Sequence, residues 1–228
     1  MAHNFSMPGD FVERVVGRQG RPHTVEEIDG PSTALVVVDM QNYFMVDPYA
    51  GAAPVAVDIV PTVNRLAAAV RAGGGSVIWF RMTAPRQTDS GWSSVRELYS
   101  EAAAAARWQS LQPDDPGSAL HPDLDVRDRD TVVVKERYSA FIPGSSNIVD
   151  VLQANGVTTL LIAGVATNVC CESTARDAMM LNYRVVMISD ACAAKTDAEH
   201  AAALGNFYLF FGDVQTTDEI IAHLVPSR

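Results

Sequence analysis

The chain has 228 residues, of which 48% are hydrophobic and 19% are charged, and its formal net charge is −10. A chain of this length can bury a full hydrophobic core, and one domain is the simplest arrangement for it. The acidic balance argues against a surface for nucleic acid or for an anionic membrane, because the field of the protein would repel both.

The N-terminal segment, residues 1–30, is polar and interrupted by Pro and Gly, with one amphipathic patch over Phe11–Val16. We expect it to form an arm that lies on the body or on a neighbouring subunit, while residues 31–228 form a single domain. Its first residues contain no continuous apolar stretch, so neither a signal peptide nor a membrane span is predicted. A cytoplasmic protein is therefore expected.

Strands and helices alternate along the domain. The expected strands are Thr33–Val38, Ser76–Phe80, Thr131–Val134, Thr159–Val165 and Arg184–Ser189, followed by a short apolar piece at Phe210–Val214. The expected helices start near Pro61 and after Ser146 or Asn147, cover Cys170–Leu181 and Asp197–Phe207, and start again at Thr217. This alternation predicts an α/β fold with a doubly wound, mainly parallel sheet flanked by helices on both faces, in three layers.

The segment Met82–Asp130 departs from that alternation. It contains the Ala-rich, helix-favouring Val95–Trp108 between loops rich in Asp, Pro and Gly. So long an excursion in a compact domain is usually functional.

Three of the apolar runs lead directly to a chemically capable side chain, namely Asp39, Lys135 and Cys170. Because the carboxyl ends of parallel strands share one edge, a carboxylate, an ammonium and a thiol are expected to meet there. At a strand-to-helix turn the Cys170 thiol would lie near free backbone N–H groups and the positive end of the helix dipole, which lower a thiol pKa. A desolvated Asp39 would carry protons between the thiol and the leaving amine, and Lys135 would orient it.

Each of these residues also has a purely structural interpretation. A free Cys in an apolar chain is more often inert core, an Asp at a strand end is often a turn former, and a strand-end Lys is often solvated. Cys171 and Cys192 are interpreted as packing residues. No Cys pair has metal-ligand spacing, and the five His are scattered, so neither a disulfide framework nor a metal site is predicted.

The segments VVVDMQ, VVVKERYSAF and GVATNVCCESTARDA resemble the three signature segments of the isochorismatase-like cysteine hydrolases. The resemblance implies a catalytic triad of Asp39, Lys135 and Cys170. It also implies a cis peptide between Val165 and Ala166, with the N–H groups of Ala166 and Cys170 directed at the oxyanion. It further implies a homodimer or homotetramer.

Within that family the motifs are most similar to those of ureidoacrylate amidohydrolases. The absence of His in RMTAPRQTDSGW argues against a nicotinamidase, and Cys170 argues against members that lack the nucleophilic thiol. The stretch from Arg81 to Ala84 departs from the ureidoacrylate pattern, and a lactam-opening hydrolase of the streptothricin type is the alternative. The predicted function is hydrolysis of a C–N bond in a small ureido, carbamoyl or amide substrate through a thioester, without a cofactor.

The substrate is expected to contact side chains just beyond the catalytic strand ends. Gln41 and Asn42 are predicted polar contacts, and Phe44 and Tyr138, with Tyr43 and Phe141, are predicted to form an aromatic wall. Arg81 or Arg86 would add a cation for a substrate carboxylate.

Two other classes of protein use similar patterns. A nucleotide-binding or redox protein on this fold would carry GxGxxG after the first strand, whereas MQNYFMVDP contains no Gly. A non-catalytic binding protein stays open as an alternative, and in it Cys170 would only pack in the core.

Overall fold

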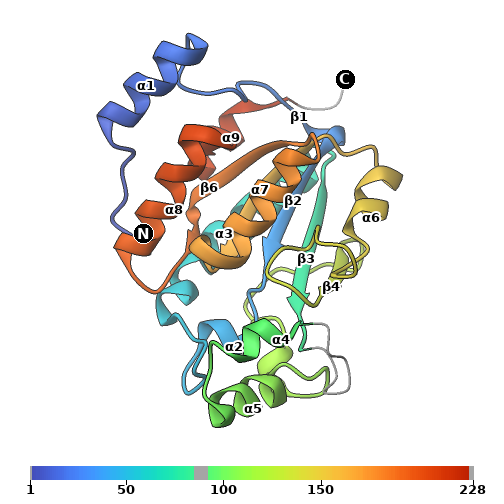
Figure 1. Ribbon diagram of the computed structural model, residues 1–228. Coiled ribbons are helices and arrows are strands. Elements are labelled where there is room, and N and C mark those ends of the chain that lie inside the picture. The colour runs from blue at the N-terminus through green and yellow to red at the C-terminus, as the bar shows by residue number, and fades with distance from the viewer. Residues whose placement is uncertain (1, 85–91, 226–228) are drawn as a thin grey trace.

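The computed structural model describes residues 2–84 and 92–225 (Figure 1). The helices are α1 (Gly9–Gln19), α2 (Asn42–Met45), α3 (Val60–Ala72), α4 (Ser93–Arg96), α5 (Glu101–Ser110), α6 (Ile148–Ala154), α7 (Glu172–Met180), α8 (Asp197–Phe210) and α9 (Thr217–His223). The strands are β1 (Ile28–Asp29), β2 (Thr33–Val38), β3 (Ser76–Met82), β4 (Thr131–Lys135), β5 (Thr159–Val165), β6 (Arg184–Ala193), β7 (Asp213–Gln215) and β8 (Leu224–Val225).

Six strands form one parallel sheet in the order β4-β3-β2-β5-β6-β7. The chain starts at the centre with β2, moves outward to β4, returns to the centre at β5 and continues to the opposite edge. The strand order therefore reverses between β2 and β5, and such a switch point is where open α/β sheets form a crevice at their carboxyl ends. The predicted fold class is confirmed.

Helices cover both faces of the sheet. Alternate residues of β2 enter two separate cores, with Val36 in one and Val37 in the other. The first core contains residues of α6, α7 and α8, and the second contains residues of α3 and α9. In Figure 1, α7 and α8 lie in front of the sheet and α3 lies behind it. Because both faces are covered, β2 is a continuous apolar run rather than an alternating one.

Three boundaries differ from the sequence prediction. The expected helix over Val95–Trp108 is divided into α4 and α5, because the Ser100 side chain accepts a hydrogen bond from Ala103 N–H and starts a new helix. The chain is still helical at Phe210, so the last strand of the sheet begins only at Asp213. The helix expected from Cys170 begins earlier, with a π-helical turn over Thr167–Cys171.

The N-terminal arm lies on the body of its own chain. Helix α1 packs along α8, where the Phe11 ring approaches Gly205 so closely that a Cβ there would lie 2.9 Å from the ring. Strand β1 then pairs in parallel with β8. A homodimer or homotetramer stays a prediction. Within the described residues, no helix is long and apolar enough to cross a membrane.

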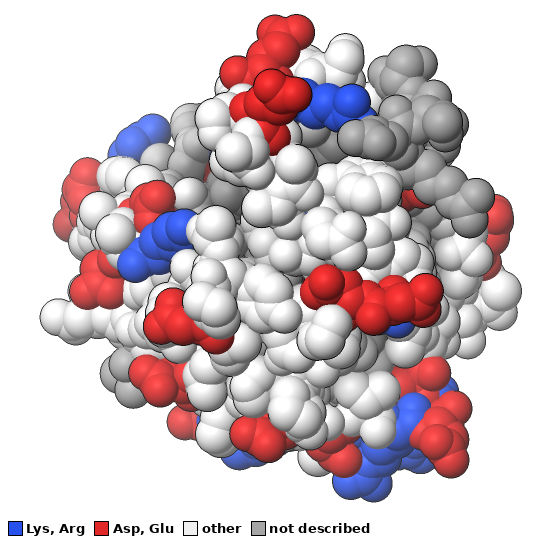
Figure 2. Space-filling view, turned by 90° about the horizontal axis from the view of Figure 1, so that it is seen from below, with Lys and Arg blue, Asp and Glu red and all other residues white. Residues whose placement is uncertain are grey.

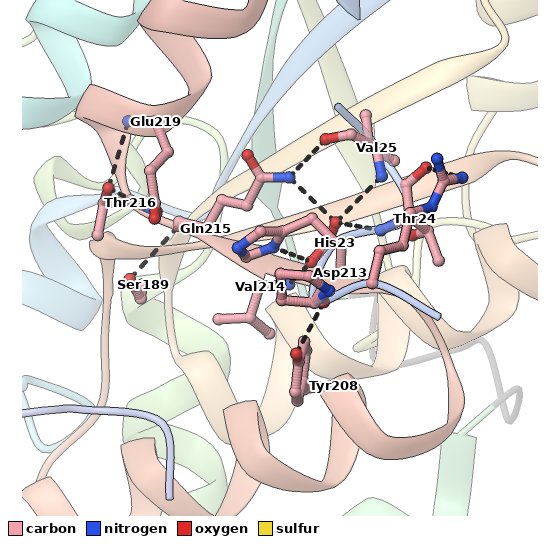
Figure 3. Close-up of polar contacts among 12 residues, drawn as sticks. His23, Thr24, Val25, Ser189, Tyr208, Asp213, Val214, Gln215, Thr216 and Glu219 are labelled. Carbon is pink, nitrogen blue, oxygen red and sulfur yellow. Dashed lines mark hydrogen bonds and ion pairs between the residues drawn. The ribbon is translucent and has the colours of Figure 1, made fainter. Parts of the chain in front are cut away.

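A buried carboxylate joins the arm to the sheet edge (Figure 3). Asp213, on β7, accepts hydrogen bonds from His23 Nδ1 at 2.8 Å and from the backbone N–H groups of Thr24 and Val25 at 2.9 and 3.1 Å. Gln215 also donates to it, at 3.0 Å, and to the Val25 carbonyl, at 2.7 Å. The hydrogen bond from Asp213 raises the pKa of His23, against the effect of burial.

Replacing Asp213 with Asn should loosen the arm. The amide loses one acceptor oxygen and places an N–H against backbone donors, which we expect to cost about 3 kcal/mol of the free energy of unfolding, given the size of hydrogen bonds to charged groups. Urea denaturation measures this change, and limited proteolysis should then cut the arm first. The control is Asp218→Asn, which removes an exposed partner of Arg65 and should change little. Equal effects of the two variants would contradict this account.

Candidate active site

The carboxyl edge of the sheet brings Asp39, Lys135 and Cys170 together. Asp39 directly follows β2, and its φ of 48° lies in the left-handed region, which Asp tolerates better than most residues. Its backbone N–H donates to the Phe80 carbonyl at 3.2 Å, so the turn stays attached to β3. Lys135 is the last residue of β4, and Cys170 lies in the turn after β5.

Lys135 and Asp39 form a buried ion pair. The distance from Lys135 Nζ to Asp39 Oδ2 is 2.7 Å, and the two side chains are 0% and 1% exposed. The ammonium also donates to the carbonyls of Arg137 at 3.0 Å and Tyr138 at 3.1 Å. Two backbone carbonyls therefore hold the ammonium in place, with its charge against the carboxylate. The alternative interpretation of Lys135 as a solvated residue at a strand end is therefore wrong.

The Cys170 turn depends on a close approach of two backbones. Gly164, on β5, has a φ of 111°, and a Cβ there would lie 2.2 Å from the Val38 carbonyl oxygen, so only Gly fits beside β2. The peptide between Val165 and Ala166 is cis, at the position that the resemblance implies. The Ala166 carbonyl then accepts from the N–H groups of Val169 and Cys171 at 3.1 Å each, which holds the turn that carries Cys170.

The resting state of the thiol differs from the sequence expectation. Burial raises the pKa of Cys170 to about 12, and the Asp39 carboxylate adds to this effect, while Lys135 opposes it. The predicted lowering of this pKa is therefore wrong, because desolvation outweighs the nearby cation. Burial also raises the pKa of Asp39. For Lys135 the effect of burial is outweighed by Asp39 and Cys170, which raise its pKa. These directions favour a protonated thiol beside the ion pair of a charged Lys135 with Asp39.

The other two cysteines pack away from the ion pair. Both are buried, Cys171 directs its sulfur to the Ala163 carbonyl at 3.9 Å, and Cys192 directs its sulfur to the Ile162 carbonyl at 3.4 Å. These contacts support their interpretation as packing residues.

Gln41 and Asn42, the two predicted polar contacts of the substrate, make hydrogen bonds within the protein. The Gln41 amide is 0% exposed and makes three hydrogen bonds to the backbone, with Met82 N–H and the carbonyls of Met82 and Ser118. It joins β3 to the segment around Ser118, and this correction removes it from the direct substrate contacts. Asn42 is half-buried and donates to the Pro116 carbonyl at 2.9 Å, so its amide also supports that segment.

Arg81, the predicted cation for a carboxylate, is directed toward Ser118 and does not line the cavity beside this edge of the sheet. Its guanidinium donates to the Ser118 carbonyl and hydroxyl at 3.1 Å each, so Arg81 supports the same segment as Gln41. Arg86 lies outside the described residues. The predicted aromatic side chains are better placed, because Phe44 is half-buried and Tyr138 packs edge-on against Trp92 at 4.8 Å. Burial raises the pKa of Tyr138 to about 12.

A cavity of about 480 Å³ opens beside this edge of the sheet, a size suited to a small molecule. Its lining includes Met82, Trp92, Tyr99, Ala104 and Arg107. Met82 pairs in register with Lys135, which places the cavity next to the ion pair, although Asp39, Lys135 and Cys170 do not line it.

Two residues near the site were not predicted from the sequence. Arg107, on α5, lines the cavity, and its charge acts to lower the pKa of both Asp39 and Cys170. His200, on α8, is 0% exposed and lies 2.9 Å from the hydroxyl of Thr167, in the turn that carries Cys170. Its ring stacks on His3 of the arm, with 4.3 Å between centroids. A lone Arg or His on a helix gives no local signal that it reaches a site across the fold.

The model of the isochorismatase domain family matches residues 33–219. The chain therefore belongs to the isochorismatase family. Ureidoacrylate amidohydrolase RutB of Acinetobacter baylyi is 31% identical over 93% of this chain and 92% of its own length.

Solved structures share the fold. A cysteine hydrolase from Pseudomonas syringae pv. phaseolicola has a TM-score of 0.77 at 32% identity, over 86% of this chain and 94% of its own. N-carbamoylsarcosine amidase from Thermoplasma acidophilum has a TM-score of 0.65 at 27% identity, over 82% and 97%. In our protein, the described residues contain no group of three or more His, Cys, Asp or Glu side chains that could hold a metal ion.

His200 should make the protein sensitive to acid. Burial and His3 lower the pKa of His200 from 6.5 to about 4, so the folded state binds its proton more weakly than the unfolded chain does. Its contribution to stability is therefore present above pH 6.5 and lost as the pH falls toward 4, by about 3 kcal/mol at about 1.4 kcal/mol per pKa unit. Urea denaturation between pH 7 and pH 4 should show a flatter acid limb for His200→Asn. Parallel pH profiles for variant and wild type would contradict this assignment.

Proposed function

We propose that the protein is a cysteine-dependent amidohydrolase that cleaves a C–N bond of a small ureido, carbamoyl or amide substrate. The observation that carries the proposal is the buried contact of Asp39, Lys135 and Cys170 at the switch point of the sheet, beside a cavity of small-molecule size. Relatives named for ureidoacrylate and N-carbamoylsarcosine support this class of substrate.

Asp39 is the proposed proton carrier. As the Cys170 sulfur attacks the substrate carbonyl carbon, its proton passes to Asp39, whose raised pKa suits a group that must accept and return a proton. The tetrahedral intermediate then collapses, the C–N bond breaks, and the leaving nitrogen takes the proton from Asp39. A thioester, or a carbamoyl thioester where a ureido or carbamoyl group was attacked, stays on Cys170. Water attacks its carbonyl carbon while Asp39 accepts a proton from the water. The C–S bond then breaks, the product leaves, and Asp39 returns the proton to the Cys170 sulfur.

Lys135 has an electrostatic task in this scheme. Thiolate character on Cys170 develops only during attack, because the resting thiol is protonated, and the ammonium stabilises the negative charge that Asp39 and Cys170 share. The backbone N–H groups of Ala166 and Cys170 are the proposed donors to the oxyanion. Every proton in the scheme moves between the substrate, water and these side chains, so the proposed reaction needs no cofactor.

Substitutions separate Cys170 from its neighbour. Cys170→Ala removes the nucleophile and should lower kcat by at least about 10³-fold without loss of fold, given the cost of removing nucleophiles in related schemes. Cys171→Val should retain most activity because that sulfur packs in the core. Asp39→Asn should cost at least about 10²-fold. Ammonia release measures the rates, and circular dichroism checks the fold. Equal losses at Cys170 and Cys171 would remove Cys170 from the mechanism.

A substrate panel tests the reaction class. Ammonia release should be seen with at least one of ureidoacrylate, an N-carbamoyl amino acid or biuret, and prior treatment with EDTA should leave that rate unchanged. Nicotinamide and a streptothricin-type lactam, the latter followed by its mass gain of one water, serve as competing substrates. Activity on the lactam alone would keep the nucleophile but overturn the ureido substrate class. Activity that returns only with an added metal would overturn the metal-free scheme.

A further inference from the structure

Arg107 lies in an aromatic cage at the wall of the cavity. Its guanidinium carbon is 5.5 Å from the ring centroid of Tyr43, 5.7 Å from that of Phe44 and 5.8 Å from that of Tyr99. Nη2 also lies 3.6 Å from the sulfur of Met82, at the end of β3. Contacts from three separate segments hold this half-buried side chain, so its position is well determined.

This cation differs from the two buried cations of the fold, Arg71 and Lys135. Arg71 is paired with Asp125 at 3.0 Å and Asp130 at 2.6 Å, and Lys135 is paired with Asp39. Among the described residues, no carboxylate lies within ion-pair distance of Arg107. Aromatic ring faces stabilise a cation without neutralising its charge. Arg107 therefore presents a full positive charge to the cavity.

Only some of the N–H donors of the Arg107 guanidinium make hydrogen bonds within the protein. A guanidinium carries five N–H donors. The described hydrogen bonds direct one of its donors to the Met82 sulfur. Donors stay available for the planar, two-bonded contact that a carboxylate makes with Arg.

The surroundings make this charge selective. Figure 2 looks onto the end of the molecule that holds α4 and α5, and its centre is largely uncharged, with acidic side chains and fewer basic ones around it. A net charge of −10 disfavours the approach of small anions in general. An anion gains most where a cation is sheltered from water, and the guanidinium of Arg107 is within electrostatic reach of Asp39 and Cys170.

We propose that Arg107 is a specificity-determining residue that binds a carboxylate on the substrate, so that the enzyme selects small ureido or carbamoyl acids over their neutral counterparts. This inference rests on the proposed function for the identity of the reacting group. Binding of the carboxylate to Arg107 orients the substrate, with its carbonyl carbon toward Cys170. The charge recognition predicted from the sequence is thereby assigned to α5 rather than to Arg81.

The test compares acids with their methyl esters. Ureidoacrylate, N-carbamoylglycine and N-carbamoylsarcosine, each with its ester, are assayed by ammonia release with wild type, Arg107→Met and Arg107→Lys. The wild type should prefer an acid over its ester by about 10²-fold in kcat/KM. Arg107→Met should lower the ratio of kcat/KM for the acid to that for the ester by about the same factor, because only the acid loses a charged partner, whereas any effect of the lost charge on Asp39 and Cys170 falls on both substrates alike. Arg107→Lys should fall between the two, since it keeps the charge but not the planar fork.

Binding is measured separately from turnover. Calorimetric titration of Cys170→Ala with the same acids and esters should show a preference for acids that is lost in Cys170→Ala/Arg107→Met. Arg65→Met, an exposed α3 residue, removes the same charge far from the cavity and is the control, with no expected change in preference.

The outcomes distinguish the two proposals. Arg107-dependent binding of acids without turnover by the wild type would support the carboxylate site and overturn the proposed reaction. Turnover that requires Cys170 but treats acids and esters alike would keep the reaction and overturn the role of Arg107. Equal losses for acid and ester in Arg107→Met would also overturn it, because such losses indicate an effect on the thiol or on the fold. The absence of any preference for acids in binding would overturn it as well.

Discussion

The buried ion pair of Lys135 and Asp39 is the constraint on which the site depends. Burying either charge alone would cost several kcal/mol, so each requires the other and both require a rigid frame. The parallel sheet supplies that frame, since β2 and β4 are held apart by β3 and the lysine side chain spans the gap. Carbonyls of Arg137 and Tyr138 complete the shell of the ammonium, which ties the loop after β4 to the same pair.

Most of the sheet could be predicted from the sequence because fully buried strands have sequences that are uninterrupted apolar runs. Thr33–Val38 and Thr159–Val165 have the predicted bounds, and the first polar residue after β2 is Asp39. The same reasoning placed Lys135 and Cys170 at one edge. The division of the excursion into α4 and α5 was missed, since helix propensity outweighed the capping signal of Ser100.

What the sequence could not supply is tertiary burial. A thiol at a strand-to-helix turn predicts a lowered pKa from local dipoles, yet the surrounding core raises it to about 12. Gln41 looked like a substrate contact because it follows Asp39, but its amide is matched to backbone groups of β3 and of the segment around Ser118. Arg107 lies in an Ala-rich helix. Its position at the cavity depends on packing against residues distant in the chain, such as Tyr43, which is more than 60 residues away.

A protonated resting thiol changes what the protein must do for catalysis. An enzyme with a preformed thiolate keeps a reactive anion at all times, whereas in the proposed scheme the anion develops only when Asp39 can accept a proton and a substrate carbonyl is in place. Correct placement of the substrate carbonyl therefore contributes more to the rate, because the attack by sulfur and the proton transfer to Asp39 must coincide. A cation on the far wall of the cavity fits this requirement. In the proposed role, Arg107 fixes one end of a substrate without touching the reacting atoms, which leaves the ion pair of Lys135 and Asp39 to act on the thiol.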